Sequence, residues 1–319
     1  MQHTRLDLAR IQAARAAIDP LFLNTPLYRC EPLEPVLGAQ VSIKLETANP
    51  VGSFKGRGAE WVAHQAEQAG VQSLVCASAG NLGTALAWSG RRRDLDVTVV
   101  ARRNAPRAKL ERISALGAKL ELVDGDFEVA RERAVVLAHR DGAQLVEDSL
   151  DLRTCEGAGT IGLELAQSLS SFDTVLIALG GGAMATGVGY VLSRLAPDTE
   201  VVCVQPQEAP ALTLSWRQRK VVTTETMNTI ADGVAGRFPI PAVLDDLLLV
   251  ADDAVLVAEE SIVAGLRVLR ERAGLVVEPS AALGVAAVLE DRERFEGKHV
   301  VTIVCGNNVD PDAYLGWVS

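Results

Sequence analysis

The chain has 319 residues, of which 48% are hydrophobic and 23% charged, enough for one large or two medium globular domains. Its formal charge of −10 argues against nucleic acid or an anionic membrane as the main partner. Five scattered cysteines without a CxxC pair, and four histidines without ligand spacing, indicate neither a disulfide framework nor a metal site. Residues 1–7 are polar and no apolar run is long enough to span a bilayer, so we expect a cytoplasmic protein.

The first half of the chain predicts alternating helices and strands. Thr4 is placed to cap a first helix that reaches Ile18, and a loop at 24–26 precedes a short strand. Apolar runs then predict strands at 41–45, 73–76, 97–101, 120–123 and 144–146. Helices are expected from near Ala59, and at 81–92, 106–117 and 126–140.

The second half repeats the alternation, with strands expected at 174–179, 201–204, 247–250 and 299–304 and helices at 157–170, 184–195, 252–274 and 279–290. Short runs rich in Val and Leu are typical of parallel strands buried on both faces. The order predicts an α/β protein with two open, mostly parallel sheets, the first inserted into the second. We expect a large domain of residues 1–67 and 151–319 and a small inserted domain of residues 68–150.

Lys55 lies in the segment Gly52-Ser-Phe-Lys-Gly-Arg-Gly58, which joins a predicted strand to a predicted helix. The helix macrodipole disfavours a further positive charge at a helix N-terminus. A lysine there is easier to deprotonate, and a neutral amine can form a Schiff base with a carbonyl. Most lysines are solvated surface residues without a chemical role, so a Schiff-base role for Lys55 depends on whether other segments provide the rest of a cofactor site.

The segment Ala77-Ser-Ala-Gly-Asn-Leu-Gly83 follows one predicted strand and opens a helix. Small residues let the backbone approach a ligand, and a new helix presents free N–H groups, which suits a carboxylate. The amide of Asn81 is able to hydrogen-bond an oxygen on a cofactor ring. A plain capped turn fits this loop equally well.

A glycine-rich loop follows the strand predicted at 174–179 and runs from Gly180 into a helix. Backbone N–H groups and the helix dipole make such a loop a phosphate cradle. A dinucleotide site competes, because Gly180, Gly182 and Ala185 satisfy the relaxed G-x-G-x-x-A pattern. That pattern also requires an acid after the next strand, where this chain has Gln205, so a lone phosphate is favoured.

The last predicted strand ends in Cys305-Gly-Asn-Asn308. A cysteine at this position is a candidate nucleophile, but no histidine lies near it in sequence to activate it. The alternatives are a buried inert thiol or a weak hydrogen-bond partner for a ring nitrogen.

Together these segments resemble the fold-type II (tryptophan synthase β-like) pyridoxal-phosphate enzymes, and within them the serine/threonine dehydratase and serine racemase group. The matching runs, in the family's order, are 44–59, 78–81, 159–161, 180–184, 229–234, 278–281 and 305–308. The resemblance covers the chain from about residue 20 onward. It implies pyridoxal 5'-phosphate as cofactor, an amino-acid substrate, an active site in the cleft between the two domains, and a homodimer.

The resemblance also implies residue roles. Lys55 would hold the cofactor covalently, Phe54 would pack on its ring, Asn81 would bond its phenolic oxygen and Cys305 would face its ring nitrogen. A thiol cannot keep that nitrogen protonated as an aspartate would, which favours rapid β-elimination. The phosphate would be held by the backbone of Gly180, Gly181, Gly182, Ala183 and Met184, and the substrate carboxylate by Ser78, Ala79, Gly80, Asn81 and Leu82.

We therefore expect a dehydratase (ammonia-lyase) that converts a 3-hydroxy-L-amino acid of the threonine or serine type to a 2-oxo acid and ammonia. Racemisation is an alternative, but Ala79 stands where the racemases carry a serine acid/base. A nicotinamide-dependent oxidoreductase is a remote alternative. With no regulatory domain after residue 319, we expect a catabolic role.

Several departures from the group's pattern bear on the substrate and on a metal ion. Gly56 replaces a bulky aliphatic residue and Leu82 replaces His or Ala. Glu147-Asp-Ser149 replaces His-Pro-(Phe/Asn). We expect a roomier, more apolar pocket, which makes threo-3-phenylserine or 3-hydroxyaspartate an alternative substrate. Gln205 and Ala211 stand where carboxylates would hold a cation, so no metal site is predicted.

Overall fold

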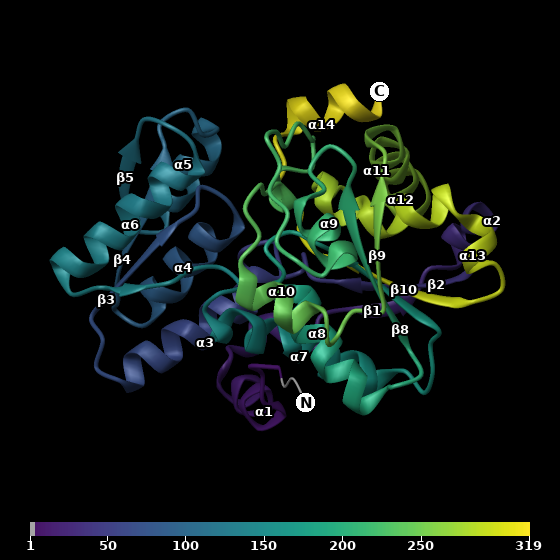
Figure 1. Cartoon of the computed structure of the whole chain (residues 1–319), viewed down its shortest axis with the longest axis horizontal. Helices are drawn as coiled ribbons and strands as arrows, with labels where there is room; N and C mark the ends of the chain where they lie inside the picture. The colour runs from purple at the N-terminus through teal and green to yellow at the C-terminus, as the bar shows by residue number, and fades with distance from the viewer. Residues whose placement is uncertain (1–3) are drawn as a thin grey trace.

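Two open sheets organise the chain, one of six strands and one of four (Figure 1). The computed structural model describes residues 4–319, and residues 1–3 of the polar N-terminus lie outside that range. The four-stranded sheet comes entirely from residues 73–145, and the six-stranded sheet comes from strands before and after that segment. The predicted class, an α/β protein with two mostly parallel sheets, is confirmed.

The four-stranded sheet is parallel throughout, in the order β5-β4-β3-β6. Leu74 and Cys76 of β3 pack on the side of α4, and Val75 packs with α6 on the opposite face. This alternation is what a strand buried on both faces requires. The elements are β3 (Ser73–Ala77), α4 (Asn81–Arg92), β4 (Asp96–Arg102), α5 (Arg107–Ala115), β5 (Lys119–Val123), α6 (Phe127–Asp141) and β6 (Gln144–Leu145).

The six-stranded sheet has the order β1-β2-β10-β7-β8-β9, and within the described residues β1 alone runs antiparallel to its neighbour. Its strands are β1 (Leu27–Arg29), β2 (Gln40–Leu45), β7 (Thr174–Ala178), β8 (Glu200–Pro206), β9 (Asp253–Val257) and β10 (His299–Val304). The accompanying helices are α1 (Leu8–Ala17), α2 (Glu34–Leu37), α3 (Lys55–Gln68), α7 (Leu152–Ser168), α8 (Ala183–Leu195), α9 (Ala211–Gln218), α10 (Pro241–Leu247), α11 (Glu259–Ala273), α12 (Leu283–Glu290), α13 (Arg292–Phe295) and α14 (Pro311–Val318).

Helices α3 and α7 cross where the two lobes of Figure 1 meet. Their backbones approach so closely that a Cβ on Gly157 would lie 2.5 Å from the Cα of Gly58. A Cβ on Gly58 would in turn lie 2.9 Å from the Cα of Thr154. Glycine is required at both positions, and the crossing fixes α3, whose first residue is Lys55, against the rest of the molecule.

The structure corrects several predicted boundaries. The strand expected at 247–250 is wrong: Pro241 starts α10, the apolar run closes that helix, and the strand is β9. The helix expected at 252–274 accordingly begins only at Glu259. Short apolar runs do not distinguish strand from helix, which explains both errors.

The N-terminal cap was also misplaced. Asp7, rather than Thr4, caps α1, because its carboxylate accepts a hydrogen bond of 2.8 Å from the backbone of Ala9. Asp is a slightly better N-cap than Thr, which favours a helix start at Leu8. Within residues 4–319, no helix combines the length and apolar character needed to cross a membrane.

Candidate active site

A pocket of about 670 Å³ is lined by loops at the carboxyl ends of strands in both sheets. Ligands of open α/β sheets bind at this edge, and the volume is in the range of small-molecule sites. The structure brings all the predicted site residues together, since the lining includes Phe54, Lys55, Ser78, Ala79, Gly80, Asn81, Leu82, Gly180, Gly181, Gly182, Ala183, Met184 and Cys305. Their individual roles stay predictions.

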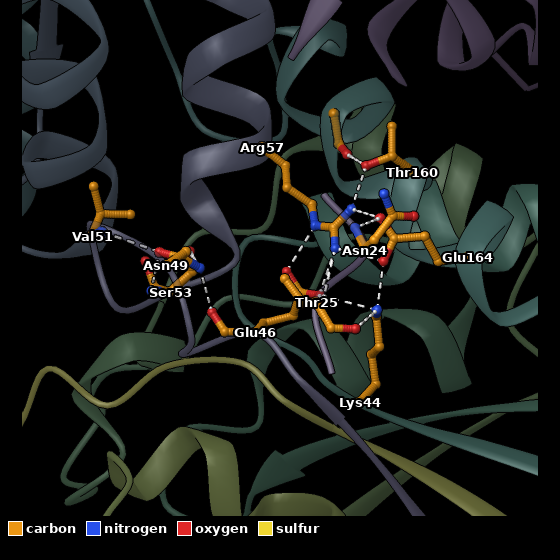
Figure 2. Close-up of polar contacts among 11 residues, drawn as sticks. Asn24, Thr25, Lys44, Glu46, Asn49, Val51, Ser53, Arg57, Thr160 and Glu164 are labelled. Atoms are coloured by element: carbon orange, nitrogen blue, oxygen red, sulfur yellow. Dashed lines mark hydrogen bonds and ion pairs between the residues drawn. The ribbon is translucent and has the colours of Figure 1, made fainter. Parts of the chain in front are cut away.

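The loop that carries Lys55 is held at both of its sides. Asn49 donates hydrogen bonds of 2.7 and 3.1 Å from Nδ2 to the carbonyls of Glu46 and Ser53, as Figure 2 shows in part. The backbone N–H of Phe54 donates to the carbonyl of Cys305 at 2.9 Å. The segment before α3 is therefore fixed to the end of β10, which places Phe54 and Cys305 on one side of the pocket.

Lys55 is the first residue of α3, and its amine contacts a carboxylate. Its Nζ lies 2.5 Å from Oδ2 of Asp148 and 4.6 Å from the centre of the Phe54 ring. The side chain is 15% exposed. The Lys55 amine thus lies between the N-terminal end of the α3 dipole and the opposing charge of Asp148, a contact that the sequence does not reveal.

Asn81 opens α4, and its side chain is held by two partners. Its Nδ2 donates to both carboxylate oxygens of Glu278 at 3.0 and 3.1 Å, and its Oδ1 accepts from Asn308 at 2.6 Å. Burial raises the pKa of Glu278, and hydrogen bonds from Asn81 and Ser280 oppose that rise only in part. The amide of Asn81 is thus oriented before any ligand enters.

The glycine loop after β7 has no room for side chains. A Cβ on Gly181 would lie 2.8 Å from Oγ of Ser149, and one on Gly182 would lie 2.6 Å from the side chain of Val243. Gly182 also has φ +103°, a conformation that favours glycine. Helix α8 begins directly after Gly182, so its N-terminus, a natural anion site, opens into the pocket.

Cys305 is buried at the end of β10. Burial, together with the nearby charge of Glu278, raises the pKa of its thiol well above the ordinary range. The thiol is therefore neutral at physiological pH. This state fits a weak hydrogen-bond partner and argues against a thiolate nucleophile.

The expectation that Gly56 enlarges the pocket is wrong. Gly56 does not line the pocket, and a Cβ there would lie 2.1 Å from the ring of Phe22. Phe22 is fully buried and packs edge-on against Trp88, with ring centres 4.9 Å apart. The space that a larger residue would fill at position 56 is occupied by Phe22. Leu82 does line the pocket. Glu147 and Asp148 of the third predicted change line it as well, and their carboxylates make that part of the pocket charged, not more apolar.

Two residues of the pocket lining, Asp148 and Glu278, were assigned no catalytic or binding role from the sequence, and neither was Ser149, which supports the pocket from outside its lining. Asp148 and Ser149 follow β6, and Glu278 precedes a short 3-10 turn at Pro279–Ala282. Ser149 has a φ of +67°. Its Oγ accepts a hydrogen bond from the backbone N–H of Ala183, so its side chain helps to hold the glycine loop in place. The rule that ligands lie at carboxyl strand ends pointed to Asp148 and Ser149, because they follow a predicted strand.

Beneath the Lys55 loop, a buried network of charges ties α3 to its surroundings (Figure 2). The guanidinium of Arg57 donates to Glu46 at 2.8 Å through two nitrogens and to Glu164 at 2.7 and 3.0 Å. Lys44 donates to Glu164 at 2.5 Å and to the carbonyl of Thr25 at 2.7 Å. Two cations face two carboxylates, so the network is neutral.

The network is stable because each buried charge has a partner. Burial alone would raise the pKa of Glu164, but the hydrogen bond and charge of Arg57, with the charge of Lys44, outweigh it and lower that pKa. Arg57 is fully buried and lies two residues after Lys55. The position of the Lys55 amine therefore depends on Arg57.

The family of the chain follows from comparison with known proteins. Residues 18–306 match the model of the pyridoxal-phosphate dependent enzyme family. The chain belongs to this family, whose cofactor is pyridoxal phosphate.

Relatives of known activity match nearly the whole chain. It is 32% identical to the L-threonine ammonia-lyase of Thermotoga maritima, over 96% of this chain and 76% of that one. It is 31% identical to the catabolic L-threonine dehydratase TdcB of Staphylococcus aureus, over 96% of this chain and 90% of that one.

Solved structures match as well. Maize serine racemase superposes with a TM-score of 0.91 at 27% identity, covering 97% of this chain and 96% of that one. A pyridoxal 5'-phosphate-dependent aspartate racemase gives a TM-score of 0.91 at 28% identity, covering 98% of each chain.

The residues present fit the cofactor. The primary amine of Lys55 and the glycine loop at 180–182, which has no room for side chains and opens helix α8, lie in one pocket. A cofactor that carries an aldehyde and a phosphate on one molecule requires such a pair of groups. Cys305, a neutral thiol in the same pocket, suits contact with an unprotonated ring nitrogen.

Removing the guanidinium of Arg57 should destabilise the protein strongly. Arg57→Met leaves two buried carboxylates facing a single cation, and we expect the free energy of unfolding to fall by about 3–5 kcal/mol. Denaturant unfolding measures this. The control Arg103→Met breaks an exposed pair with Asp124 and should cost at most about 1 kcal/mol. Equal losses in the two variants would contradict the importance of the network.

A side chain at Gly182 should weaken cofactor binding. Gly182→Ala places a Cβ against Val243 at a positive φ, a strain of about 1–3 kcal/mol, so the dissociation constant of pyridoxal phosphate should rise about tenfold or more. Fluorescence titration of the apoprotein measures it. Gly142→Ala also has positive φ but has open space around it and lies outside the pocket lining. Unchanged affinity in Gly182→Ala would remove the loop from the phosphate site.

Proposed function

We propose that the protein is a dehydratase (ammonia-lyase) that converts a 3-hydroxy-L-amino acid of the threonine or serine type to a 2-oxo acid and ammonia. Relatives named for threonine dehydration, with 31–32% identity over 96% of this chain, support this choice. The observation that carries it is that Lys55 and Ala79 both line the pocket. Lys55 offers an amine that acts as a base, whereas the methyl side chain of Ala79 has no proton to give.

At the Cα atom of the substrate, a protein group that can accept or donate a proton is then present on one face only, and that group is the Lys55 amine. Pyridoxal phosphate, when bound, withdraws electrons from the amino acid and makes its Cα–H bond acidic. The amine of Lys55 removes that proton as a general base. Without a group at position 79 to return a proton from the opposite face, loss of the β-hydroxyl is the favoured outcome.

The bonds balance without an added oxidant or reductant. The Cα–H and Cβ–O bonds break, a Cα–Cβ double bond forms, and the hydroxyl leaves as water. The released enamine hydrolyses to a 2-oxo acid and ammonia. The N-terminus of α4, where the N-cap residue Gly80 has no side chain to cap the first turn, supplies N–H groups for the substrate carboxylate.

The pocket size does not single out the smallest substrates. The contribution expected from Gly56 is absent, but Leu82 and the volume of about 670 Å³ leave threo-3-phenylserine as a candidate beside threonine and serine. Racemisation is the second candidate function, because the structures of serine and aspartate racemases superpose well on this chain.

Lys55→Ala should abolish turnover of every substrate in a panel of serine, threonine, threo-3-phenylserine and 3-hydroxyaspartate, each as both enantiomers. The reason is the loss of the only base proposed for Cα. Assays of 2-oxo acid and ammonia measure it, with Lys119→Ala, an exposed lysine of β5, as the control that keeps wild-type rates. Wild-type turnover by Lys55→Ala would end the assignment.

Ala79→Ser should add racemisation. The new hydroxyl supplies a proton from the face opposite the Lys55 amine, so D-serine should accumulate from L-serine while oxo acid formation falls. Chiral chromatography measures both products. Ala77→Ser adds a hydroxyl at another lining position and serves as the control. If wild-type protein already inverts L-serine efficiently, the choice of dehydratase over racemase is wrong.

A further inference from the structure

Asp148 is the carboxylate of the pocket lining that pairs with the amine of Lys55. Glu147 pairs with Arg131 at 2.5 Å, and Glu128 pairs with Arg237 at 3.0 Å. Asp148 instead faces Lys55, with Oδ2 at 2.5 Å from Nζ. Its Oδ1 is buried and has no hydrogen-bond partner among residues 4–319. A buried oxygen without a partner calls for a functional explanation.

The fold places Asp148 beside the loop at 78–82, which we expect to bind the substrate carboxylate. Strand β6 pairs in parallel with β3, so residues that follow these two strands emerge at the same edge of the sheet. Ser78 and Ala79 follow β3, and Asp148 follows β6. The carboxylate of Asp148 therefore lies at the same edge of the sheet as Ser78 and Ala79.

We propose that Asp148 is a positioning residue for Lys55: it orients the free amine toward Cα and stabilises the ammonium that forms when the amine takes the Cα proton. This inference rests on the proposed function, in which Lys55 is the base. It assigns Asp148 no contact with the reacting carbon.

The charges explain why the carboxylate assists. Before proton transfer, an N–H of the neutral amine donates to Asp148, which fixes the direction of the nitrogen lone pair. The Cα–H bond then breaks, its proton moves to Nζ, and an ammonium faces the carboxylate. Hydrogen bonds between opposite charges are about twice as strong as neutral ones, so the contact strengthens as the proton moves. Lys55 is 15% and Asp148 30% exposed, which limits screening by water.

The same charge affects the choice of substrate. A β-carboxylate brought near Lys55 also approaches Asp148, and two like charges at short distance repel. We therefore expect threonine or serine to be used in preference to 3-hydroxyaspartate.

The first test uses the apoprotein and needs no turnover. Lys55 is acetylated with acetic anhydride at pH 8, and the rate is followed by peptide mass spectrometry. In Asp148→Asn the rate should rise about three- to thirtyfold, because the amine is no longer held in a charge-assisted contact with the carboxylate and is free to react. Glu147→Gln removes the adjacent carboxylate, whose partner is Arg131, and should react as wild type does. An unchanged rate in Asp148→Asn overturns the proposal.

The second test uses the loaded enzyme. Asp148→Asn should lower kcat for L-threonine about ten- to a hundredfold with little change in KM, and Asp148→Glu should restore part of the loss. The rate for 3-hydroxyaspartate relative to threonine should rise in Asp148→Asn. A loss that Asp148→Glu does not restore, or one confined to KM, contradicts a positioning role.

The two proposals fail in different ways. If the wild type forms no oxo acid but the acetylation rates differ as expected, the proposed function is wrong while the contact of Asp148 with Lys55 stands. If the wild type is an active dehydratase and the acetylation rates agree, the role of Asp148 is wrong. Thermal unfolding of Asp148→Asn near the wild-type temperature shows that the variant is folded.

Discussion

The neutral network of four buried charges around Arg57 is the constraint on which the site depends (Figure 2). It joins the end of β2, the first turn of α3 and the middle of α7. Breaking a buried ion pair leaves a charge without compensation, so these elements cannot shift separately at low cost. Because Lys55 precedes Arg57 by two residues, the network determines where the amine enters the pocket, and the close crossing at Gly58 and Gly157 reinforces it.

The chemistry is assembled from loops that lie far apart in sequence. The parallel strands bring the segment after β3, the glycine loop after β7 and Cys305 after β10 to one pocket. We propose a different part for each loop: N–H groups for a carboxylate, a cradle for a phosphate, and a neutral thiol. Asp148, from the loop after β6, adds a charge that acts on Lys55. This combination suits one-sided proton transfer and loss of a β-substituent.

Much of this was predictable from sequence, for physical reasons. Glycine loops after apolar runs indicate their chemistry locally, so the cradle at 180–184 and the segment at 78–82 could be found without coordinates. Contacts between residues that lie far apart in the sequence could not be predicted in this way. Nothing near Gly56 in sequence shows that Phe22 fills its space, and nothing near Lys55 shows that Asp148 lies 2.5 Å from its amine. The prediction of a strand at 247–250 was wrong because an apolar run of four residues fits the end of a helix equally well.

The central claim is that Lys55 carries the cofactor. Borohydride reduction of the protein loaded with pyridoxal phosphate, followed by proteolysis and peptide mass spectrometry, tests this directly, because reduction makes the lysine–cofactor bond permanent. We expect a single pyridoxyl group, on the peptide that contains Lys55. A pyridoxyl group on another lysine, with Lys55 unmodified, would contradict it.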